Sequence, residues 1–366
     1  MAGSILGTIF CISTWGESHG AGVGVVVDGC PAGVELCEAD IQKYLNRRKP
    51  GQSKFSTPRK EEDLVKILSG VFEGKTTGTP ISMIVQNQTQ RSKDYSEIAQ
   101  YYRPGHADFT FDQKYGFRDY RGGGRSSGRE TIARVAAGAV AQKVLESLGI
   151  SVIAYTKKIG SIEINMEQFE LEEITKNPVC MPDQKAAKKA EAFLEECIKE
   201  QDSAGGVIEC VIKGVPVGIG EPVFEKLDAN LAKAILSIGA VKGFEIGDGF
   251  SVAEKLGSKN NDLFFMQNGK VAKKTNHAGG ILGGISDGSE IVFRAAVKPT
   301  PSIAKEQQTV NRKGEEISIC VKGRHDPIIV PRAVVVVESM AAITLLDALL
   351  VSMTSRLEWI QRFFRA

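Results

Sequence analysis

The sequence predicts a mixed α and β protein whose helices are buried. Short apolar runs typical of strands, such as residues 23–27, alternate with longer helical patterns, and no regular βαβ spacing is present. Residues 128–148 form a helical pattern rich in Ala and Val with almost no polar face, which is typical of a helix packed on every side. No strong repeat and no linker interrupts the chain, so we expect one domain spanning 1–366.

The individual elements follow from local patterns. Apolar, β-branched runs predict strands over residues 5–12, 23–27, 65–72, 81–85, 205–217 and 290–298, and a strand followed by a bend over residues 150–164. Helical periodicity predicts helices over residues 38–48, 128–148, 184–201 and 228–237, and a further helix opens near Pro331, where a first turn tolerates proline. Helix 38–48 would bury Ile41, Tyr44 and Leu45 and stop at Pro50. Residues 256–275 are polar, which predicts a mobile surface excursion.

Bulk properties exclude several classes of protein. A net charge of +2 argues against a general nucleic-acid or membrane-surface binder. The longest apolar run, residues 334–351, is interrupted by Glu338, Ser339 and Asp347, and no signal peptide is present, so we expect a cytoplasmic protein without a membrane span. The seven cysteines form no C-x-x-C pair, which favours reduced thiols and predicts no metal site.

The most informative stretch spans residues 102–145. Gly122, Gly123 and Gly124 precede a helix start at which Ser127 and Glu130 form a capping-box pattern. Arg121, Arg125 and Arg129 flank the glycines. Free backbone N–H groups, the positive end of a helix dipole and guanidinium groups together favour an anion, above all a phosphate. The alternative is an arginine-rich surface loop.

Two histidines lie in glycine turns, His19 in residues 16–20 and His106 in residues 103–108, where an exposed imidazole can exchange a proton. Residues 47–60 carry six basic and no acidic side chains. This segment is either a solvated loop or a mobile lid that brings positive charge to an anionic substrate. The glycines at 20, 22 and 24 precede a strand and not a helix, which excludes a dinucleotide fingerprint, and neither a nucleophile elbow nor a Walker phosphate loop is present.

Several long motifs together make the chain resemble the chorismate synthase family. In order they are GESHG (16–20), RPGHAD (103–108), RDYRGGGRSS (118–127), GEPVF (220–224), KGFEIG (242–247), NHAGGILGGIS (276–286) and GRHDP (323–327). They cover nearly the whole chain in the order and spacing of that family. The resemblance implies an α+β fold, a β-α-β sandwich with buried Ala-rich helices, assembled as a homotetramer.

The resemblance also implies a carbon–oxygen lyase of the shikimate pathway. Its reaction is the 1,4-anti elimination of phosphate from 5-enolpyruvylshikimate 3-phosphate to give chorismate, with reduced FMN and no net redox change. The hydrogen that is lost sits on a weakly acidic carbon, for which a side chain alone is a poor base, so a flavin is a fitting partner. Some members of the family also reduce their own flavin with NADPH, but the length of this chain and its lack of large insertions favour an external supply of reduced FMN.

The family's site residues map onto this sequence one by one. The catalytic residues would be His19, acting on the departing phosphate, His106, acting on the reduced flavin, and Asp326, relaying a proton at the flavin N5. Substrate anions would be held by Arg48, Lys54, Arg103, Arg129 and Arg324. Flavin contacts would come from Arg125, Ser126, Ser127, Gly239, Ala240, Gly283, Lys298, Pro299, Thr300, Pro301, Ser302 and Arg324. Many relatives carry Arg where this chain has Lys49 and Lys54, which keeps the charge but loses bidentate geometry.

Three other functions compete with this interpretation. The segment 121–125 resembles a short RGG tract, and nearby tyrosines could stack on bases, as in an RNA-binding protein. The low net charge and the single tract count against it. A phosphatase without flavin would need an activated nucleophile or metal ligands, and the sequence shows neither. A flavin-binding protein without activity would result if His19, His106 and Asp326 did not converge.

Overall fold

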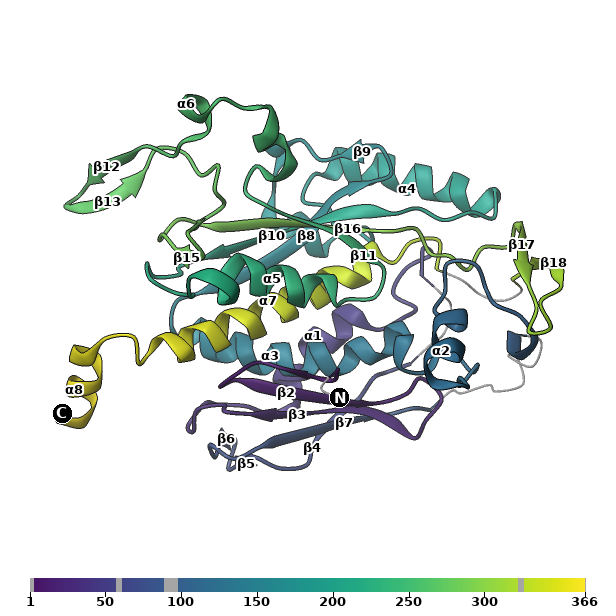
Figure 1. Cartoon of the computed structure of the whole chain (residues 1–366), viewed down its shortest axis with the longest axis horizontal. Helices are drawn as coiled ribbons and strands as arrows, with labels where there is room; N and C mark the ends of the chain where they lie inside the picture. Colours follow the sequence, from purple (N-terminus) through teal and green to yellow (C-terminus); the bar gives the residue numbers. More distant parts are fainter. Residues whose placement is uncertain (1–2, 57–60, 89–97, 322–325, 366) are drawn as a thin grey trace.

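Two antiparallel sheets enclose the helices in a computed structural model that describes residues 3–56, 61–88, 98–321 and 326–365 (Figure 1). The first sheet has the strand order β1 (Ile5–Leu6), β2 (Cys11–Gly16), β3 (Gly22–Asp28), β7 (Ile81–Gln86) and β4 (Val65–Ile67). The second has the order β11 (Val241–Ile246), β16 (Ile291–Val297), β10 (Gly206–Lys213), β8 (Ser151–Ile159) and β9 (Ile162–Glu163).

The helices between the sheets are α1 (Glu38–Arg48), α3 (Thr131–Ser147), α5 (Leu227–Leu236) and α7 (Val330–Ser352). Helix α3 packs on β2, β3 and β7 of the first sheet, α7 packs on β8 and β10 of the second, and the two helices pack on each other. This layering confirms the predicted α+β fold, a β-α-β sandwich. Helix α4 (Gln184–Lys199) lies outside it, against β9 (Figure 1).

Alternation along the strands turns one face of each sheet towards the helices. Ile81, Met83 and Val85 of β7 are buried, and Ile291 and Phe293 of β16 are buried in the same way. Intervening side chains on both strands are more accessible. This is the pattern of antiparallel sheets with one covered face.

Small residues allow α3 and α7 to approach each other closely. Most of α3 from Thr131 to Leu145 is buried, as its apolar pattern predicts. A Cβ added at Gly138 would lie 2.2 Å from the Cβ of Ser339 on α7, so only glycine fits at this crossing. By length and composition α7 could cross a membrane, yet 72% of its most apolar window is buried inside the protein, as in the core helix of a soluble protein.

The remaining elements form the periphery. They are α2 (Asp108–Tyr115), α6 (Gly257–Asn260), α8 (Leu357–Arg365), and the hairpins β5 (Val71–Phe72) with β6 (Lys75–Thr76), β12 (Phe264–Gln267) with β13 (Lys270–Lys273), β14 (Ile281–Leu282) with β15 (Ile285–Ser286), and β17 (Glu306–Val310) with β18 (Glu316–Cys320). Short 3₁₀ helices are η2 (Ile98–Gln100), η3 (Gly124–Ser126), η4 (Gly128–Glu130), η5 (Met166–Gln168), η6 (Leu171–Thr175), η7 (Val223–Glu225) and η8 (Gly249–Glu254).

Two predicted strands are interrupted. The predicted strand 5–12 breaks after Leu6, because Gly7 has φ +101° and the N–H groups of Thr8, Ile9 and Phe10 all donate to the carboxylate of Asp347 on α7. The predicted strand 65–72 divides into β4 and β5, with Gly70 at φ +81° between them.

Candidate functional site

The glycine-rich segment after α2 packs against the end of β2. Gly122, Gly123 and Gly124 have φ values of +62°, +82° and +53°, so all three adopt a left-handed conformation that favours glycine. The guanidinium group of Arg125 donates to the carbonyl of Gly16 at 3.1 Å and to Oγ1 of Thr14 at 2.8 Å. Three glycines are therefore needed to turn the chain and bring Arg125 onto β2.

His19 lies directly against this segment. Its Nδ1 is 2.9 Å from Oγ of Ser18, which is itself 3.2 Å from the carbonyl of Gly122. A Cβ added at Gly122 would lie 2.4 Å from Cε1 of His19. The backbone of Gly122 and the hydroxyl of Ser18 therefore fix the position of the His19 ring.

The predicted helix start at 128 is a 3₁₀ turn, and the α-helix begins at Thr131. The hydroxyl of Ser127 accepts a hydrogen bond from the N–H of Arg129 at 3.3 Å, so Ser127 caps the turn as predicted. The carboxylate of Glu130 instead pairs with Nε of Arg134 at 2.9 Å. Arg134 also donates to Oγ of Ser237 at 2.6 Å, which ties the start of α3 to the end of α5.

His106 is held by a second group of predicted residues. Its Nδ1 is 3.0 Å from the carbonyl of Pro104 and its Nε2 is 2.9 Å from Oγ of Ser302. Because a carbonyl only accepts, Nδ1 carries the proton in the neutral ring, and Nε2 accepts from the hydroxyl of Ser302. Burial, followed by the charge of Arg103, lowers the pKa of His106 to about 4. His106 is therefore neutral at physiological pH in this structure.

The loop of residues 298–302 contacts the His106 turn and the 239–240 turn. Nζ of Lys298 donates to the carbonyl of Gly105 at 2.7 Å, and its backbone N–H donates to the carbonyl of Ala240 at 2.9 Å. Pro301 packs against Gly105, where an added Cβ would lie 2.7 Å away. Oγ1 of Thr300 is buried and has no hydrogen-bond partner within the described parts of the chain.

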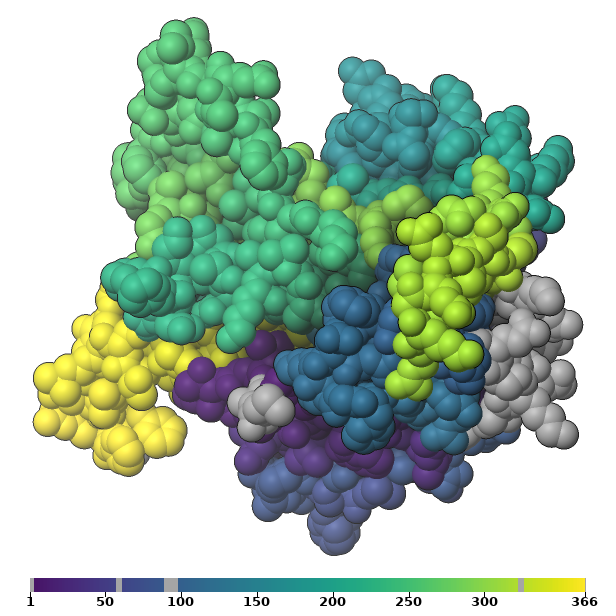
Figure 2. Space-filling view, turned by 45° about the vertical axis from the view of Figure 1, so that its right-hand side comes forward, coloured from purple at the N-terminus to yellow at the C-terminus, as the bar shows by residue number. Residues whose placement is uncertain are grey.

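Hairpin β17–β18 closes over the chain that leads into the His106 turn. The N–H of Tyr102 donates to the carbonyl of Val310 at 3.2 Å, and Oγ1 of Thr309 donates to the carbonyl of Tyr102. Figure 2 shows this hairpin lying over the segment around α2.

A cluster of charged side chains brings further predicted residues together. NH2 of Arg48 is 2.7 Å from one oxygen of Asp63, and NH1 of Arg129 is 3.1 Å from the other. Arg129 also pairs with Glu61, and its Nε donates to Oδ1 of Asn87. Burial lowers the pKa of Arg129, and the charges of Asp63 and Glu61 oppose this effect. The cluster thus combines closely packed cations and carboxylates in a buried place.

Asn87 links this cluster to the His19 turn. Its Nδ2 donates to the carbonyls of Glu17 at 3.0 Å and Gly20 at 2.8 Å, while its Oδ1 accepts from Arg129. The residue therefore bridges the loop of His19 and the guanidinium group of Arg129.

Arg332 links the cluster to Asp326. NH1 of Arg332 is 2.7 Å from Oδ2 of Asp326, and its Nε donates to the backbone carbonyl of Arg48 at 3.1 Å. Two hydrogen bonds then connect this region to the 298–302 loop: the N–H of Ala204 donates to the carbonyl of Pro327 at 2.9 Å, and Oγ of Ser203 donates to the carbonyl of Thr300 at 2.7 Å.

Other predicted residues have partners of their own or lie elsewhere. Arg103 forms a bidentate pair with Asp108 at 2.8 and 2.9 Å. Burial raises the pKa of Asp108, but the hydrogen bonds and charge of Arg103 outweigh it and hold this pKa below its ordinary value. Lys54 pairs with Glu195 of α4 at 2.5 Å on an accessible surface. Gly283 lies in the turn between β14 and β15, and Arg324 lies outside the described residues.

Sequence reasoning missed Asp63, Asn87 and Arg332. None of them lies in a recognisable local motif, and each acts by joining segments that are far apart in the sequence. Only Arg332 left a signal in the sequence, because it directly follows Pro331 at a helix start. A cation is unfavourable at the positive end of a helix dipole, so Arg332 needs a carboxylate partner there.

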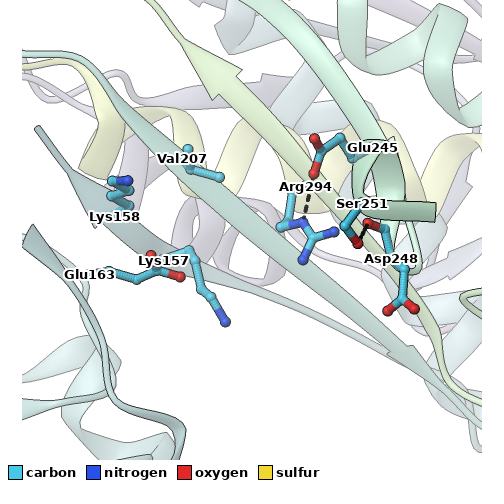
Figure 3. Close-up of a pocket in the computed structure, with 8 residues that line it drawn as sticks. All are labelled: Lys157, Lys158, Glu163, Val207, Glu245, Asp248, Ser251 and Arg294. Carbon is cyan, nitrogen blue, oxygen red and sulfur yellow. Dashed lines mark hydrogen bonds and ion pairs between the residues drawn. The ribbon is translucent and has the colours of Figure 1, made fainter. Parts of the chain in front are cut away.

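A separate pocket of about 320 Å³ contains none of the predicted site residues. Figure 3 shows it beside the second sheet, with Lys157, Glu245 and Arg294 among its charged side chains. Nε of Arg294 is 3.2 Å from Oε2 of Glu245. Charges of both signs meet here, and the arginine is already paired.

Comparisons with known proteins agree with the motifs. A sequence model of the family described as chorismate synthase matches residues 10–350. A protein of Lachnoclostridium phytofermentans named chorismate synthase is 69% identical over 366 residues, covering 100% of both chains. One of Methanosarcina mazei with the same name is 57% identical over 353 residues, covering 96% of this chain and 97% of the relative.

A solved structure also matches in fold. It is titled "Crystal Structure of Chorismate Synthase", has a TM-score of 0.76 and 32% sequence identity, and the match covers 97% of this chain and 96% of that one. The family model and the full-length relatives together show that this chain belongs to the chorismate synthase family.

Proposed function

We propose that this chain catalyses the 1,4-anti elimination of phosphate from 5-enolpyruvylshikimate 3-phosphate to give chorismate, with reduced FMN as cofactor and no net redox change. Family membership supports an enzyme of this kind. The observation that carries the proposal is the hydrogen-bonded connection of the His19 turn, through Asn87 and Arg129, to the cluster that holds Asp326. It joins the GESHG motif to Asp326 of the GRHDP motif, at opposite ends of the sequence, through residues that belong to neither motif.

The arginine cluster fits a substrate with several negative charges. Within the described residues, Nε of Arg48 and NH2 of Arg129 are buried and have no hydrogen-bond partner. Leaving a charged buried donor unsatisfied is costly, so an anionic ligand that accepts from these groups would stabilise the site. Arg48 and Arg129 would therefore bind substrate anions, and Arg103, Lys54 and Arg324 complete the proposed set.

The second group of residues fits a phosphate-bearing flavin. The 298–302 loop provides an ammonium group and hydroxyls, including the buried Oγ1 of Thr300, which has no partner in the described chain. Gly239 and Ala240 lie beside this loop and carry no bulky side chain. Arg125, Ser126, Ser127 and Gly283 belong to the same proposed set. When bound, reduced FMN supplies electron density while the allylic phosphate leaves and accepts the hydrogen from the substrate.

The side chains of the protein would hold protons at three places. The Ser18 hydroxyl orients the His19 ring, and His19 would transfer a proton to the departing phosphate. His106 is held as a neutral ring with Nε2 facing Ser302, and would stabilise the reduced flavin. Asp326 is held by Arg332 and would relay a proton at the flavin N5.

Several further properties belong to the same proposal. The chain would act as a cytoplasmic lyase of the shikimate pathway and assemble as a homotetramer. Residues 1–366 would form one domain. We further propose that reduced FMN comes from an external source and that NADPH is used only if the chain also reduces flavin.

The test is phosphate release from 5-enolpyruvylshikimate 3-phosphate under anaerobic conditions. One arm supplies chemically reduced FMN, and the other supplies oxidised FMN with NADPH. Turnover only with reduced FMN would support an enzyme without flavin reductase activity, and turnover in both arms would add that activity. No turnover in either arm, with flavin bound, would refute the proposed function.

A further inference from the structure

Five charged residues form a continuous series in the arginine cluster. Arg129 contacts Asp63, Asp63 contacts Arg48, the backbone carbonyl of Arg48 accepts from Arg332, and Arg332 contacts Asp326. These contacts measure 3.1, 2.7, 3.1 and 2.7 Å. The series therefore connects the segment before β4 and the end of α1 with η4 and the start of α7.

Asp63 lies at the centre of the series. Its side chain is fully buried, and each of its two oxygens accepts from a different guanidinium group. Two buried cations this close repel each other in a low-dielectric environment, so the carboxylate between them sets their separation. The backbone of Asp63 has φ +49°, a conformation that few residues other than glycine adopt, and the two ion pairs accompany this arrangement.

The contacts with Asp63 use only some of the guanidinium nitrogens of Arg48 and Arg129, and other nitrogens of the two side chains could bind a ligand. Asp63 takes NH2 of Arg48 and NH1 of Arg129, whereas Nε of Arg48 and NH2 of Arg129 have no partner within the described residues. A planar guanidinium group fixed on one side presents its remaining N–H donors in a defined direction. The contact with Asp63 therefore determines where those donors point.

Arg332 extends the same control to Asp326. Its side chain is mostly buried, and one guanidinium group spans the carbonyl of Arg48 and the carboxylate of Asp326. A lysine at this position would carry the charge but could not make both contacts with the same geometry. The position of Asp326 is thereby linked to the position of Arg48.

We propose that Asp63 and Arg332 are positioning residues of the active site: Asp63 fixes the spacing of Arg48 and Arg129, and Arg332 fixes Asp326 relative to Arg48. The proposal rests on the proposed function where it concerns turnover. Its anion-binding part does not depend on turnover.

The central variant is Asp63→Asn, which keeps the shape and one acceptor oxygen but presents an NH2 group to one of the two arginines. Asp183→Asn is the matched control, because Asp183 is also buried and accepts three backbone hydrogen bonds, from Asn165, Lys185 and Ala186. For Asp63→Asn we expect KM for the substrate to rise roughly 10- to 100-fold, the effect of losing a hydrogen bond to a charged group. The control should stay within about threefold of the unaltered chain, a margin well below one such bond.

A double-mutant cycle separates positioning from a general loss of stability. If Asp63 acts through Arg48, then Asp63→Asn combined with Arg48→Lys should lower kcat/KM little more than the more harmful single substitution. Effects that multiply would mean that the two residues act independently and would overturn the proposal. If Asp63→Asn does not fold, Arg332→Lys provides the test, with a fall in kcat/KM of roughly 100-fold expected from a misplaced reacting group. A folded Arg332→Lys enzyme with unchanged kcat and KM would overturn the proposal.

Binding of inorganic phosphate, measured by calorimetry, keeps this inference distinct from the proposed function. If the unaltered chain binds phosphate but catalyses no turnover, the proposed function fails and the spacing role of Asp63 is still tested. A weaker affinity for phosphate in Asp63→Asn than in Asp183→Asn supports that role. Equal affinities in the two variants, or no phosphate binding by the unaltered chain, would overturn it.

Discussion

Replacing Gly122 with alanine should displace His19 at little cost to the fold. The new Cβ would lie 2.4 Å from Cε1 and 2.6 Å from Nδ1 of His19. Because carbon atoms in contact are about 3.5 Å apart, the ring must move by about 1 Å. Alanine at φ +62° adds backbone strain of roughly 1–2 kcal/mol. A displacement of about 1 Å at a reacting group lowers turnover by roughly 100-fold.

The assay is anaerobic phosphate release with reduced FMN, and the matched control is Gly116→Ala. Gly116 has φ +79°, but a Cβ added there meets nothing within 4 Å, so this variant has the backbone strain without the clash. We expect both variants to lose similar stability in thermal unfolding, and only Gly122→Ala to lose kcat. If the kcat of Gly122→Ala stayed within about threefold of the control, far less than a 1 Å displacement should cost, His19 would not be the proton donor that we propose.

Two further predictions concern pH and packing. The pKa of His106, about 4, lies below its ordinary value of 6.5, so its contribution to stability is complete above pH 6.5 and is lost as the pH falls towards 4. His106→Asn should therefore lose less stability than the unaltered chain between pH 7 and pH 4.5 in urea unfolding, by about 2 kcal/mol. An equal loss in the two proteins would contradict the effect of burial on His106. Gly138→Ala should destabilise the protein by about 1–3 kcal/mol because its Cβ would lie 2.2 Å from Ser339. Gly128→Ala, with nothing within 4 Å of the added Cβ, should be nearly neutral in the same urea experiment, and equal unfolding midpoints for the two alanine variants would contradict the packing argument.

The sequence predicts most of the long elements because their signals are local. Helix α1 spans residues 38–48 as expected, and the apolar pattern of α3 correctly indicates a buried helix. The break after Leu6 was not predictable, because Asp347 lies far along the chain and accepts the N–H groups that a strand would have used. Hairpin β12–β13 lies in a segment whose polar composition predicted only a mobile surface excursion.

The candidate site was predictable in part for the same reason. Motifs with special backbone geometry, such as Gly122 beside His19, can be found in the sequence because glycine marks them. A carboxylate that pairs with an arginine cannot be found in this way, because any Asp or Glu in the chain could form such a pair. Asp63 became recognisable only when folding placed it beside Arg48 and Arg129.

The internal partners of the arginines explain how the site can exist before its ligand arrives. Arg48 is buried and Arg129 and Arg332 are mostly buried, and a cluster of three such cations without counterions would be strongly destabilising. Glu61, Asp63 and Asp326 supply three negative charges against them. A ligand with one negative charge gains little from a cluster that is already neutralised. One with several charges can accept from the donors that these carboxylates leave open, so the cluster should select multiply charged anions over simple carboxylates. Calorimetric titration of the unaltered chain with citrate, inorganic phosphate and acetate would measure the affinity for each anion. Equal affinities for the three anions would contradict this selectivity.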